Sequence, residues 1–383
     1  MMDLSFSEEQ EMLRTMVHDF LTDRCPKKLV EQLENSDIGY SPEIWKEMAG
    51  LGWIGLAFPE KYGGAGMSFL DLAILLEEMG RACLPSPYFS TVILGGLPIL
   101  NIGNEAQKQE YLPKIARGEL IFTLALTEPA AKYSPESIAV NATANKDEYV
   151  LNGTKLFVPD AHIADYMLCV AGRGDGSRGE AGICIFIVDA KSAGVSCKVL
   201  ETIASDKLCE VVFHQVEVPK KNLLGELNSG WGNVQNILGM ATVAKCCEML
   251  GGAQQVMEMT IDYAKNRRQF DRAIGSFQII QHYCADMLID VDAMRYSTYQ
   301  AAWMISQGLP CTREVAIAKA WANEAYGRII ALAHQIHGAI GFTTDHDLHF
   351  YTKRAKAAQV TFGNTDFHRD IVAQMMAYHN QDS

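Results

Sequence analysis

The sequence predicts an α+β protein in which a helical region, a β region and a second helical region follow one another. Three observations predict this order. Apolar residues first recur at helical spacing, give way near residue 122 to short β-rich runs, and return to helical spacing from about residue 231. We therefore expect an N-terminal helical domain (1–121), a middle antiparallel β domain of the sandwich or barrel kind (122–230), and a C-terminal four-helix bundle (231–383).

The first region opens with a helix-start signal. Ser7-Glu8-Glu9-Gln10 supplies a capping hydroxyl and places acidic residues at the positive end of the helix dipole. Apolar residues at helical spacing predict another helix from Leu70 to Met79. The glycine-rich stretch Tyr62 to Gly66 reads as a turn between helices, because it lacks the preceding strand of a dinucleotide-binding loop.

The middle region consists of short strand-like runs separated by Gly, Asp, Ser and Pro. The runs are Tyr149–Gly153 after a polar turn, Tyr166–Ala171, Ile183–Val188 and Val211–Val218. In the last region, two apolar stripes at helical spacing predict two helices, and a third helix is expected from about Thr312 to Ala333. The first stripe consists of Leu250, Ala253, Met257, Ile261 and Ala264, and the second of Ile280, Cys284, Met287, Val291 and Met294.

Composition excludes several classes of protein. The 383 residues are 48% hydrophobic and 21% charged, with 33 basic and 46 acidic side chains and a net charge of −13. This composition is globular, and an acidic chain without a basic run argues against nucleic acid as a partner. No apolar run approaches the roughly 18 residues that span a bilayer, so membrane insertion is not expected. No signal peptide is readable, and we expect a cytoplasmic protein.

Cysteine and histidine usage does not indicate a metal site. The ten cysteines form no C-x-x-C pair and mostly lie in apolar runs, so we expect reduced, packed thiols. In Asp345-His346-Asp347-Leu348-His349, two histidines stand three residues apart. On a helix they would face one way, as ligands do, but in an acidic loop we interpret them as solvated turn residues.

Four sequence motifs follow one another along the chain. They are Leu124-Ala125-Leu126-Thr127-Glu128-Pro129, Tyr149-Val150-Leu151-Asn152-Gly153-Thr154-Lys155, Arg267-Arg268-Gln269-Phe270 followed by Phe277-Gln278, and Gln335-Ile336-His337-Gly338-Ala339-Ile340-Gly341-Phe342. Together they resemble the acyl-CoA dehydrogenase flavoprotein family over essentially the whole chain. The resemblance implies the cofactor FAD, an acyl-CoA thioester substrate, a homo- or hetero-tetramer with a related subunit, and an electron-transferring flavoprotein as electron acceptor.

The resemblance also implies which residues bind the flavin. A strand supplies backbone donors along the isoalloxazine edge, and Arg267 can bind the pyrophosphate with two parallel hydrogen bonds. Gly338 and Gly341 let the backbone approach the phosphates. In the family the last of these groups reach a flavin in a neighbouring subunit. The residues carried over are Leu126, Thr127, Phe157, Arg267, Phe270, Ile274, Gln278, Gln335, Ile336 and Ala339.

The sequence departs from the family on the substrate side. Family dehydrogenases use a glutamate to take the proton α to the thioester, and that glutamate stands at one of two places. Here the first holds Phe362 (Gly363 if the register slips by one) and the second holds Ala241, so no catalytic residue is assigned. Thr242 replaces the arginine on the CoA side. Tyr88 and Ser90 map to the helix lining the acyl pocket, and we expect Tyr88, Ser90, Ala241, Thr242 and Phe362 around the substrate.

Two further departures lie at the reactive edge of the flavin. Phe157-Val158-Pro159 replaces the family's W-[IS]-[TS], and Lys132-Tyr133-Ser134 replaces its G-S-D turn. Proline has no N–H to donate, and no hydroxyl takes the place of the missing one. The pyrophosphate-side motifs are nevertheless retained, which random drift in an inactive protein does not explain.

Three hypotheses fit this asymmetry. The chain can be the base-less subunit of a mixed tetramer, as the stretch from Phe362 to Arg369 suggests by its similarity to such small subunits. It can be a homotetrameric flavoenzyme with a displaced acid, for which Asp160 and Asp366 are candidates, or with different acyl-CoA chemistry. It can also be a non-catalytic binding member of the fold.

Overall fold

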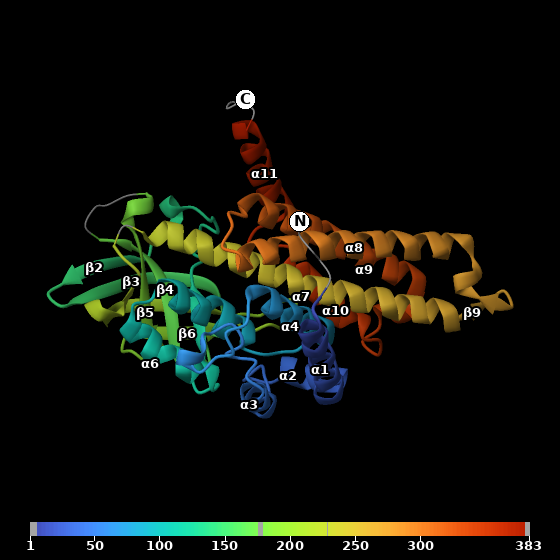
Figure 1. Ribbon diagram of the computed structural model, residues 1–383, viewed down its shortest axis with the longest axis horizontal. Helices are drawn as coiled ribbons and strands as arrows, with labels where there is room; N and C mark the ends of the chain where they lie inside the picture. Colours follow the sequence, from blue (N-terminus) through green and yellow to red (C-terminus); the bar gives the residue numbers. More distant parts are fainter. Residues whose placement is uncertain (1–5, 175–178, 228, 380–383) are drawn as a thin grey trace. The chain divides into compact units, whose positions relative to one another are not determined.

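The computed structural model of the protein describes residues 6–174, 179–227 and 229–379 (Figure 1). The chain divides into two compact units that alternate along the sequence. Unit 1 comprises Met1–Glu31, Ser68–Leu84 and Gly239–Ser383, and unit 2 comprises Gln32–Met67 and Pro85–Leu238. The predicted order of helical, β and helical segments is confirmed by the elements of the described residues.

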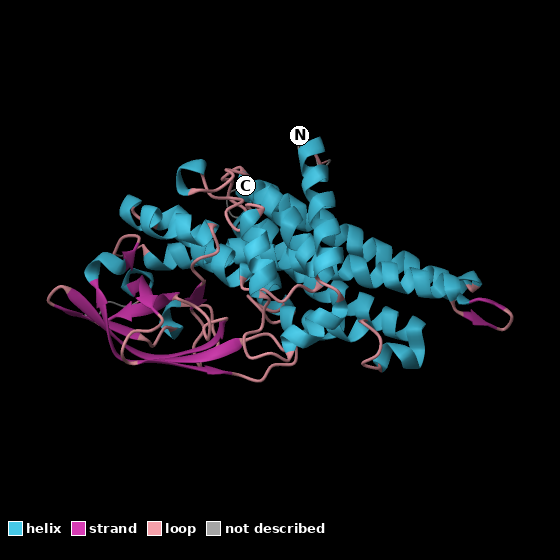
Figure 2. Ribbon diagram, turned by 90° about the horizontal axis from the view of Figure 1, so that it is seen from below, coloured by secondary structure: helices cyan, strands magenta, loops and turns pink. Residues whose placement is uncertain are grey.

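Unit 2 is built on one eight-stranded sheet, drawn in magenta in Figure 2. Its strands run in the order β6-β7-β3-β2-β4-β5-β8, and β1 pairs with β4. The pairs β1–β4 and β2–β4 are parallel, whereas the other pairs are antiparallel. The strands are β1 (Phe122–Ala125), β2 (Asn141–Asn145), β3 (Glu148–Pro159), β4 (Tyr166–Arg173), β5 (Ile183–Asp189), β6 (Val195–Val199), β7 (Leu208–Pro219) and β8 (Leu223–Leu224).

The sheet buries one apolar face in a core made mainly of valine, alanine, cysteine and phenylalanine side chains. Leu151, Val211 and Phe186 are fully buried in it, as alternation along half-buried strands predicts. The helical segments of unit 2 are α3 (Pro42–Gly50), the π-helix η2 (Phe89–Gly96), α5 (Leu97–Ile102) and α6 (Glu105–Ala116), while α2 (Lys27–Glu34) crosses the boundary between the units.

Within its described residues, unit 1 is helical apart from one short hairpin. Its helices are α1 (Glu8–Arg24), α4 (Phe69–Ala82), most of α7 (Gly230–Asn266), α8 (Gln278–Ser306), α9 (Thr312–His337), α10 (Leu348–Ala358) and α11 (Thr365–His379). The hairpin of β9 (Arg268–Gln269) and β10 (Arg272–Ala273) joins α7 to α8 at one end of these helices (Figure 2). The predicted start of α1 is confirmed, because Ser7 and Gln10 form a reciprocal capping box.

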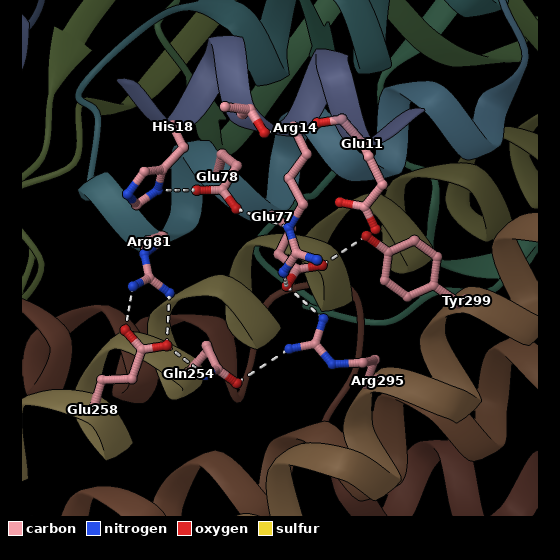
Figure 3. A network of polar contacts seen from close by, with 11 residues as sticks. Glu11, Arg14, His18, Glu77, Glu78, Arg81, Gln254, Glu258, Arg295 and Tyr299 are labelled. Atoms are coloured by element: carbon pink, nitrogen blue, oxygen red, sulfur yellow. Dashed lines mark hydrogen bonds and ion pairs between the residues drawn. The ribbon is translucent and has the colours of Figure 1, made fainter. Parts of the chain in front are cut away.

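A network of buried charges ties four helices of unit 1 together (Figure 3). Glu77 and Glu78 of α4 are only 2% and 4% exposed. The Arg295 guanidinium lies 2.7 Å from Glu77, and the Tyr299 hydroxyl donates to the same carboxylate at 2.6 Å. Glu78 pairs with Arg14 and with the His18 ring of α1. Buried carboxylates need such partners, so these contacts hold α1, α4 and α8 in register, and Arg81 with Glu258 adds α7.

Candidate active site

The end of β1 forms the edge at which the sequence predicts the flavin ring. Leu126 is buried and Thr127 is half-buried at the point where the strand ends. The Thr127 carbonyl accepts a hydrogen bond from the Leu156 N–H at 2.8 Å, which sets β3 beside it. Phe157 follows with its ring 50% exposed. Leu126, Thr127 and Phe157 therefore lie together on unit 2, next to backbone groups that a flat heteroaromatic ring can use.

A buried ion pair holds this edge in place. Lys155 is completely buried, and its ammonium lies 2.6 Å from the Glu128 carboxylate and 3.1 Å from the Leu126 carbonyl. The same carboxylate accepts hydrogen bonds from the N–H groups of Ala139 and Val140 at 2.6 and 3.1 Å. The pair fixes both ends of the predicted flavin edge. Both residues stand within the motifs that carry the resemblance, and the charge inside each apolar run is the signal in the sequence that points to this pair.

The segment after Lys155 is locally strained and holds a carboxylate. Phe157 and Asp160 have φ angles of +54°, a region that residues with a Cβ seldom adopt. The Pro159 carbonyl accepts a hydrogen bond from the Thr123 hydroxyl at 2.5 Å. Asp160 in turn accepts one from the Ser90 hydroxyl at 2.6 Å. The result is an anchored carboxylate directly after the predicted flavin-facing residues.

The two predicted acyl-pocket residues of unit 2 both make protein contacts. Tyr88 is 1% exposed, and its hydroxyl donates to the Trp53 carbonyl at 2.9 Å. Burial raises the pKa of this phenol far above its ordinary value, so it stays neutral. Ser90 lies in the π-helix η2, bonded to the Pro87 carbonyl and to Asp160. A π-helix is rare and often marks a functional site, so the position of Ser90 keeps the prediction of a substrate role open.

The predicted pyrophosphate residues lie around the hairpin of unit 1. Arg267 follows α7 directly and is exposed, while its carbonyl accepts the Ile274 N–H at 2.8 Å. Phe270, at the hairpin turn, is 86% exposed and Gln278 is the first, exposed residue of α8. This arrangement places a guanidinium, an amide and an uncovered aromatic ring on one local surface, where they can bind a group supplied from outside unit 1.

The second predicted pyrophosphate segment lies beside the first. The rings of Tyr263 and His337 stack with centroids 4.5 Å apart, and they come from α7 and α9 respectively. Gln335 and Ala339 are exposed beside them, whereas Ile336 is buried. The pKa of His337 is lowered by burial, so its ring is neutral near pH 7. Sequence reasoning missed Tyr263, because nothing local indicates a partner so distant in sequence.

The first place expected for a glutamate is a strained turn without a carboxylate. Phe362 has a φ angle of +57° and its carbonyl accepts a hydrogen bond from the His368 Nε2–H at 2.9 Å. The Asn323 amide donates to the Gly363 carbonyl at 3.4 Å, and the buried Lys319 ammonium lies 2.5 Å from the Asn323 side-chain oxygen. These bonds fix the turn without supplying a proton acceptor at Phe362. Asp366 is exposed in the first turn of α11.

The second expected place is also apolar. Ala241 is fully buried in α7, and Thr242 is 3% exposed beside it. The nearest acid on the same helix, Glu248, pairs with Lys245 at 2.5 Å. No carboxylate therefore stands at either place that the resemblance gives for the base.

No group of three or more potential ligands capable of holding a metal ion occurs among the described residues. His346 lies in the turn before α10, whereas His349 lies within the helix. All ten cysteines are described and form no disulfide; seven are buried, and Cys197 is exposed. No helix in the described part of the chain is long and apolar enough to cross a membrane.

Comparison with known proteins covers nearly the whole chain. Three family models match, described as acyl-CoA dehydrogenase N-terminal domain over residues 7–119, middle domain over 123–216 and C-terminal domain over 228–377. A probable acyl-CoA dehydrogenase YngJ of Bacillus subtilis is 32% identical, over 98% of this chain and 100% of its own. The caffeyl-CoA reductase–Etf complex subunit CarC of Acetobacterium woodii is 31% identical, over 97% and 99%.

Solved structures agree with these matches. Butyryl-CoA dehydrogenase from Megasphaera elsdenii superimposes with a TM-score of 0.90 at 29% identity, covering 98% of this chain and 100% of that one. The ChsE4–ChsE5 complex from Mycobacterium tuberculosis superimposes with a TM-score of 0.90 at 26% identity, covering 98% and 99%. The same fold thus occurs in a butyryl-CoA dehydrogenase and in a complex of two named chains.

Proposed function

Since this chain belongs to the acyl-CoA dehydrogenase family, we propose that it is the base-less chain of a mixed tetramer that acts on the Cα–Cβ bond of an acyl-CoA thioester. The chain is an FAD-dependent oxidoreductase of that family. A related chain supplies the carboxylate that this one lacks. Electrons pass to or from an electron-transferring flavoprotein, a proposal supported by the relative that is named as a subunit of a reductase–Etf complex.

The residues present fit the cofactor. FAD supplies the acceptor or donor of hydride at the β carbon. Thr127 and Phe157 border the flavin ring on unit 2, and the Glu128–Lys155 pair fixes their spacing. Arg267 and Gln278 are exposed on unit 1, where a pyrophosphate dianion can take their hydrogen bonds. Phe270, 86% exposed, offers an aromatic face that a bound ligand or a second chain can cover.

The observation that carries the proposal is the turn around Phe362. Its backbone is fixed by His368 and, at the next residue, by Asn323, so the segment is ordered but holds no proton acceptor. Removing a proton α to a thioester needs a base within hydrogen-bonding reach of that carbon. An ordered turn, a base-less position and retained pyrophosphate residues together favour a subunit that binds ligands and leaves proton transfer to a partner.

A partner chain is also supported by the exposed apolar surface of unit 1. Phe342 is 74% exposed and Phe270 is 86% exposed, and both belong to the predicted pyrophosphate segments. The resemblance places these two segments at the flavin of a neighbouring subunit, where a second chain would cover both rings. A similar structure is described as a complex of ChsE4 with ChsE5, which gives a precedent for two chains in this fold.

A second candidate function rests on Asp160. The Ser90 hydroxyl holds its carboxylate at 2.6 Å, directly after the predicted flavin-facing segment. In this case the chain forms a homotetramer, and Asp160 exchanges the substrate proton. The relative named 3-(aryl)acrylate reductase supports chemistry in the reducing direction.

The test is to purify the chain alone and together with a related chain encoded nearby in its genome. We expect the pair to hold FAD in a fixed ratio and the flavin absorbance to bleach with an acyl-CoA, whereas the chain alone shows no bleaching. Bleaching by the chain alone contradicts the mixed tetramer. Loss of that bleaching in Asp160→Asn, with FAD retained, then supports the second candidate. FAD-free chains that bind no thioester contradict both.

A further inference from the structure

We propose that Cys197 and Cys209 form a peroxide-responsive thiol pair that closes to a disulfide at the edge of the unit 2 sheet. The pair stands outside the predicted flavin and substrate residues. The inference that this thiol pair exists does not depend on the proposed function. The effect of the disulfide on the flavin edge, described below, rests on the proposed function.

Strand register brings the two cysteines to one face of the sheet. In the antiparallel pair β6–β7, Cys197 lies opposite Val211 and Val199 lies opposite Cys209. Residues opposite each other share a face, so Cys197 and Cys209 are diagonal neighbours on the side to which Val211 points. The register therefore makes the two thiols neighbours on this face in the reduced protein.

The two thiols differ in access. Cys197 is exposed, whereas Cys209 on the neighbouring strand is fully buried. An oxidant from solvent reaches the Cys197 sulfur first. The buried sulfur then stands ready to attack, as in redox sensors where a reactive cysteine lies beside a resolving one.

The thiols also differ in acidity. The neighbouring Cys209 thiol lowers the pKa of the Cys197 thiol, because it can donate to the thiolate. The neighbouring Cys197 and burial raise the pKa of Cys209. Burial also raises the pKa of the half-buried Cys284 and Cys311. Since the thiolate is the reactive form, Cys197 is expected to react faster than either of these thiols.

His162 provides an acceptor for the proton of the buried thiol. Its Nε2 lies 3.2 Å from the Ile38 carbonyl, which only accepts, so Nε2 carries the hydrogen. Its Nδ1 is then a lone-pair acceptor, and it lies 4.0 Å from the Cys209 sulfur. Once Cys197 is oxidised, the Cys209 thiol can donate to the His162 Nδ1, which takes up the thiol proton as the Cys209 sulfur attacks.

The reaction balances with hydrogen peroxide as the oxidant. The Cys197 thiolate attacks one peroxide oxygen, the O–O bond breaks, a sulfenic acid forms, and the leaving hydroxide takes up the proton that Cys197 released and becomes water. The Cys209 sulfur then attacks the sulfenic sulfur while its proton passes to His162, the S–O bond breaks, and the leaving hydroxide takes that proton from His162 to become water. In sum, two thiols and one peroxide give one disulfide and two waters, and both sulfur atoms are oxidised while the peroxide is reduced.

Closing the disulfide must move the edge strand. Diagonal neighbours have Cα atoms about 7–8 Å apart, and a disulfide prefers about 4.4–6.8 Å. β6 can move, because it is an edge strand paired only with β7. In β7, Cys209 lies opposite Val158 and Leu208 opposite Pro159 of β3. The displacement therefore reaches the Phe157–Asp160 segment, which borders the flavin in the proposed function.

The test exposes the purified protein to hydrogen peroxide with a metal chelator present, blocks free thiols with a maleimide and maps the peptides by mass spectrometry. We expect the Cys197 and Cys209 peptides to become linked with loss of two hydrogens, and dithiothreitol to reverse this. In Cys209→Ser, Cys197 should stop at the sulfenic acid and react with dimedone. In Cys197→Ser, Cys209 should stay reduced at the same peroxide dose.

Matched controls are provided by the other accessible thiols. Before oxidation, maleimide should modify Cys197 faster than Cys284 or Cys311, because a larger fraction of the Cys197 thiol is in the reactive thiolate form. Equal rates for the three thiols, or oxidation of Cys197 to sulfinic acid with Cys209 untouched, would overturn the proposal.

The flavin arm is read separately in the FAD-loaded protein. Disulfide formation should change the flavin absorbance spectrum or increase FAD release, and Cys197→Ser should abolish that change. A disulfide that leaves both unchanged in FAD-loaded protein overturns the link to the flavin edge while the thiol pair stands. A protein that never loads FAD contradicts the proposed function alone.

Discussion

Replacing Lys155 by methionine removes the ammonium from the buried pair that holds the predicted flavin edge. The side chain is completely buried, and its Nζ contacts Glu128 at 2.6 Å and the Leu126 carbonyl at 3.1 Å. Leaving one partner of a buried pair unmatched costs about 3–5 kcal/mol of unfolding free energy. Two backbone N–H groups still bind the Glu128 carboxylate, so we expect the lower end, about 3 kcal/mol.

The assay is urea unfolding followed by tryptophan fluorescence, to which Trp45, Trp53 and Trp231 of unit 2 contribute. If the free energy of unfolding falls by about 2–3 kcal/mol per molar urea, the urea concentration at the unfolding midpoint should fall by about 1 M. Lys191→Met is the matched control, because its pair with Asp165 spans 3.6 Å and Lys191 is 81% exposed. The FAD-to-chain ratio should fall only in Lys155→Met. Equal midpoints for the two variants would refute the role given to the buried pair.

Three other predictions concern the proposed site. In the Phe362→Glu variant, an acyl-CoA should bleach the flavin about 10²–10⁴ times faster than in the Phe362→Gln variant, as expected for one added base. Equal stopped-flow bleaching rates for the two variants would place the catalytic turn elsewhere. Arg267→Gln should weaken FAD binding, measured by titration, about 10–100-fold, since a hydrogen bond to a charged group contributes about 1.5–3 kcal/mol. Arg117→Gln is the control and should leave FAD binding unchanged, because the Arg117–Glu119 pair is exposed. Burial lowers the pKa of His368 from 6.5 to about 4 in the folded protein. As the pH drops, the unfolded chain therefore binds a proton before the folded chain does. The free energy of unfolding should fall between about pH 6.5 and pH 4, by up to about 3 kcal/mol. His368→Gln, whose amide can still donate to the Phe362 carbonyl, should lose this part of the pH dependence in acid unfolding, and an unchanged pH profile would contradict it.

Local patterns in the sequence predicted the elements well. The capping residue Ser7 starts α1, and the apolar stripe through Leu250 and Ala264 lies within α7. Both signals act within a few residues along the chain, where hydrogen bonding and side-chain spacing decide the structure. The run Ile183–Val188 became the buried strand β5 for the same reason.

Pairing between distant segments could not be predicted in the same way. The order of the unit 2 strands depends on which faces meet in the core, and no local pattern records that. Glu128 and Lys155 stand 27 residues apart, and their pairing follows from the register of β3 beside the end of β1. The stacking of Tyr263 on His337 joins two predicted pyrophosphate segments through helices α7 and α9, which the motifs alone did not reveal.

The dependence of catalysis on a second chain is tested most directly by the flavin content and acyl-CoA bleaching of the purified chain, alone and co-purified with a related chain. The turn at Phe362 holds no proton acceptor, so the chain alone should give no bleaching, while the pair should bleach fully. One FAD per chain together with full bleaching by a homotetramer of this chain would contradict that dependence.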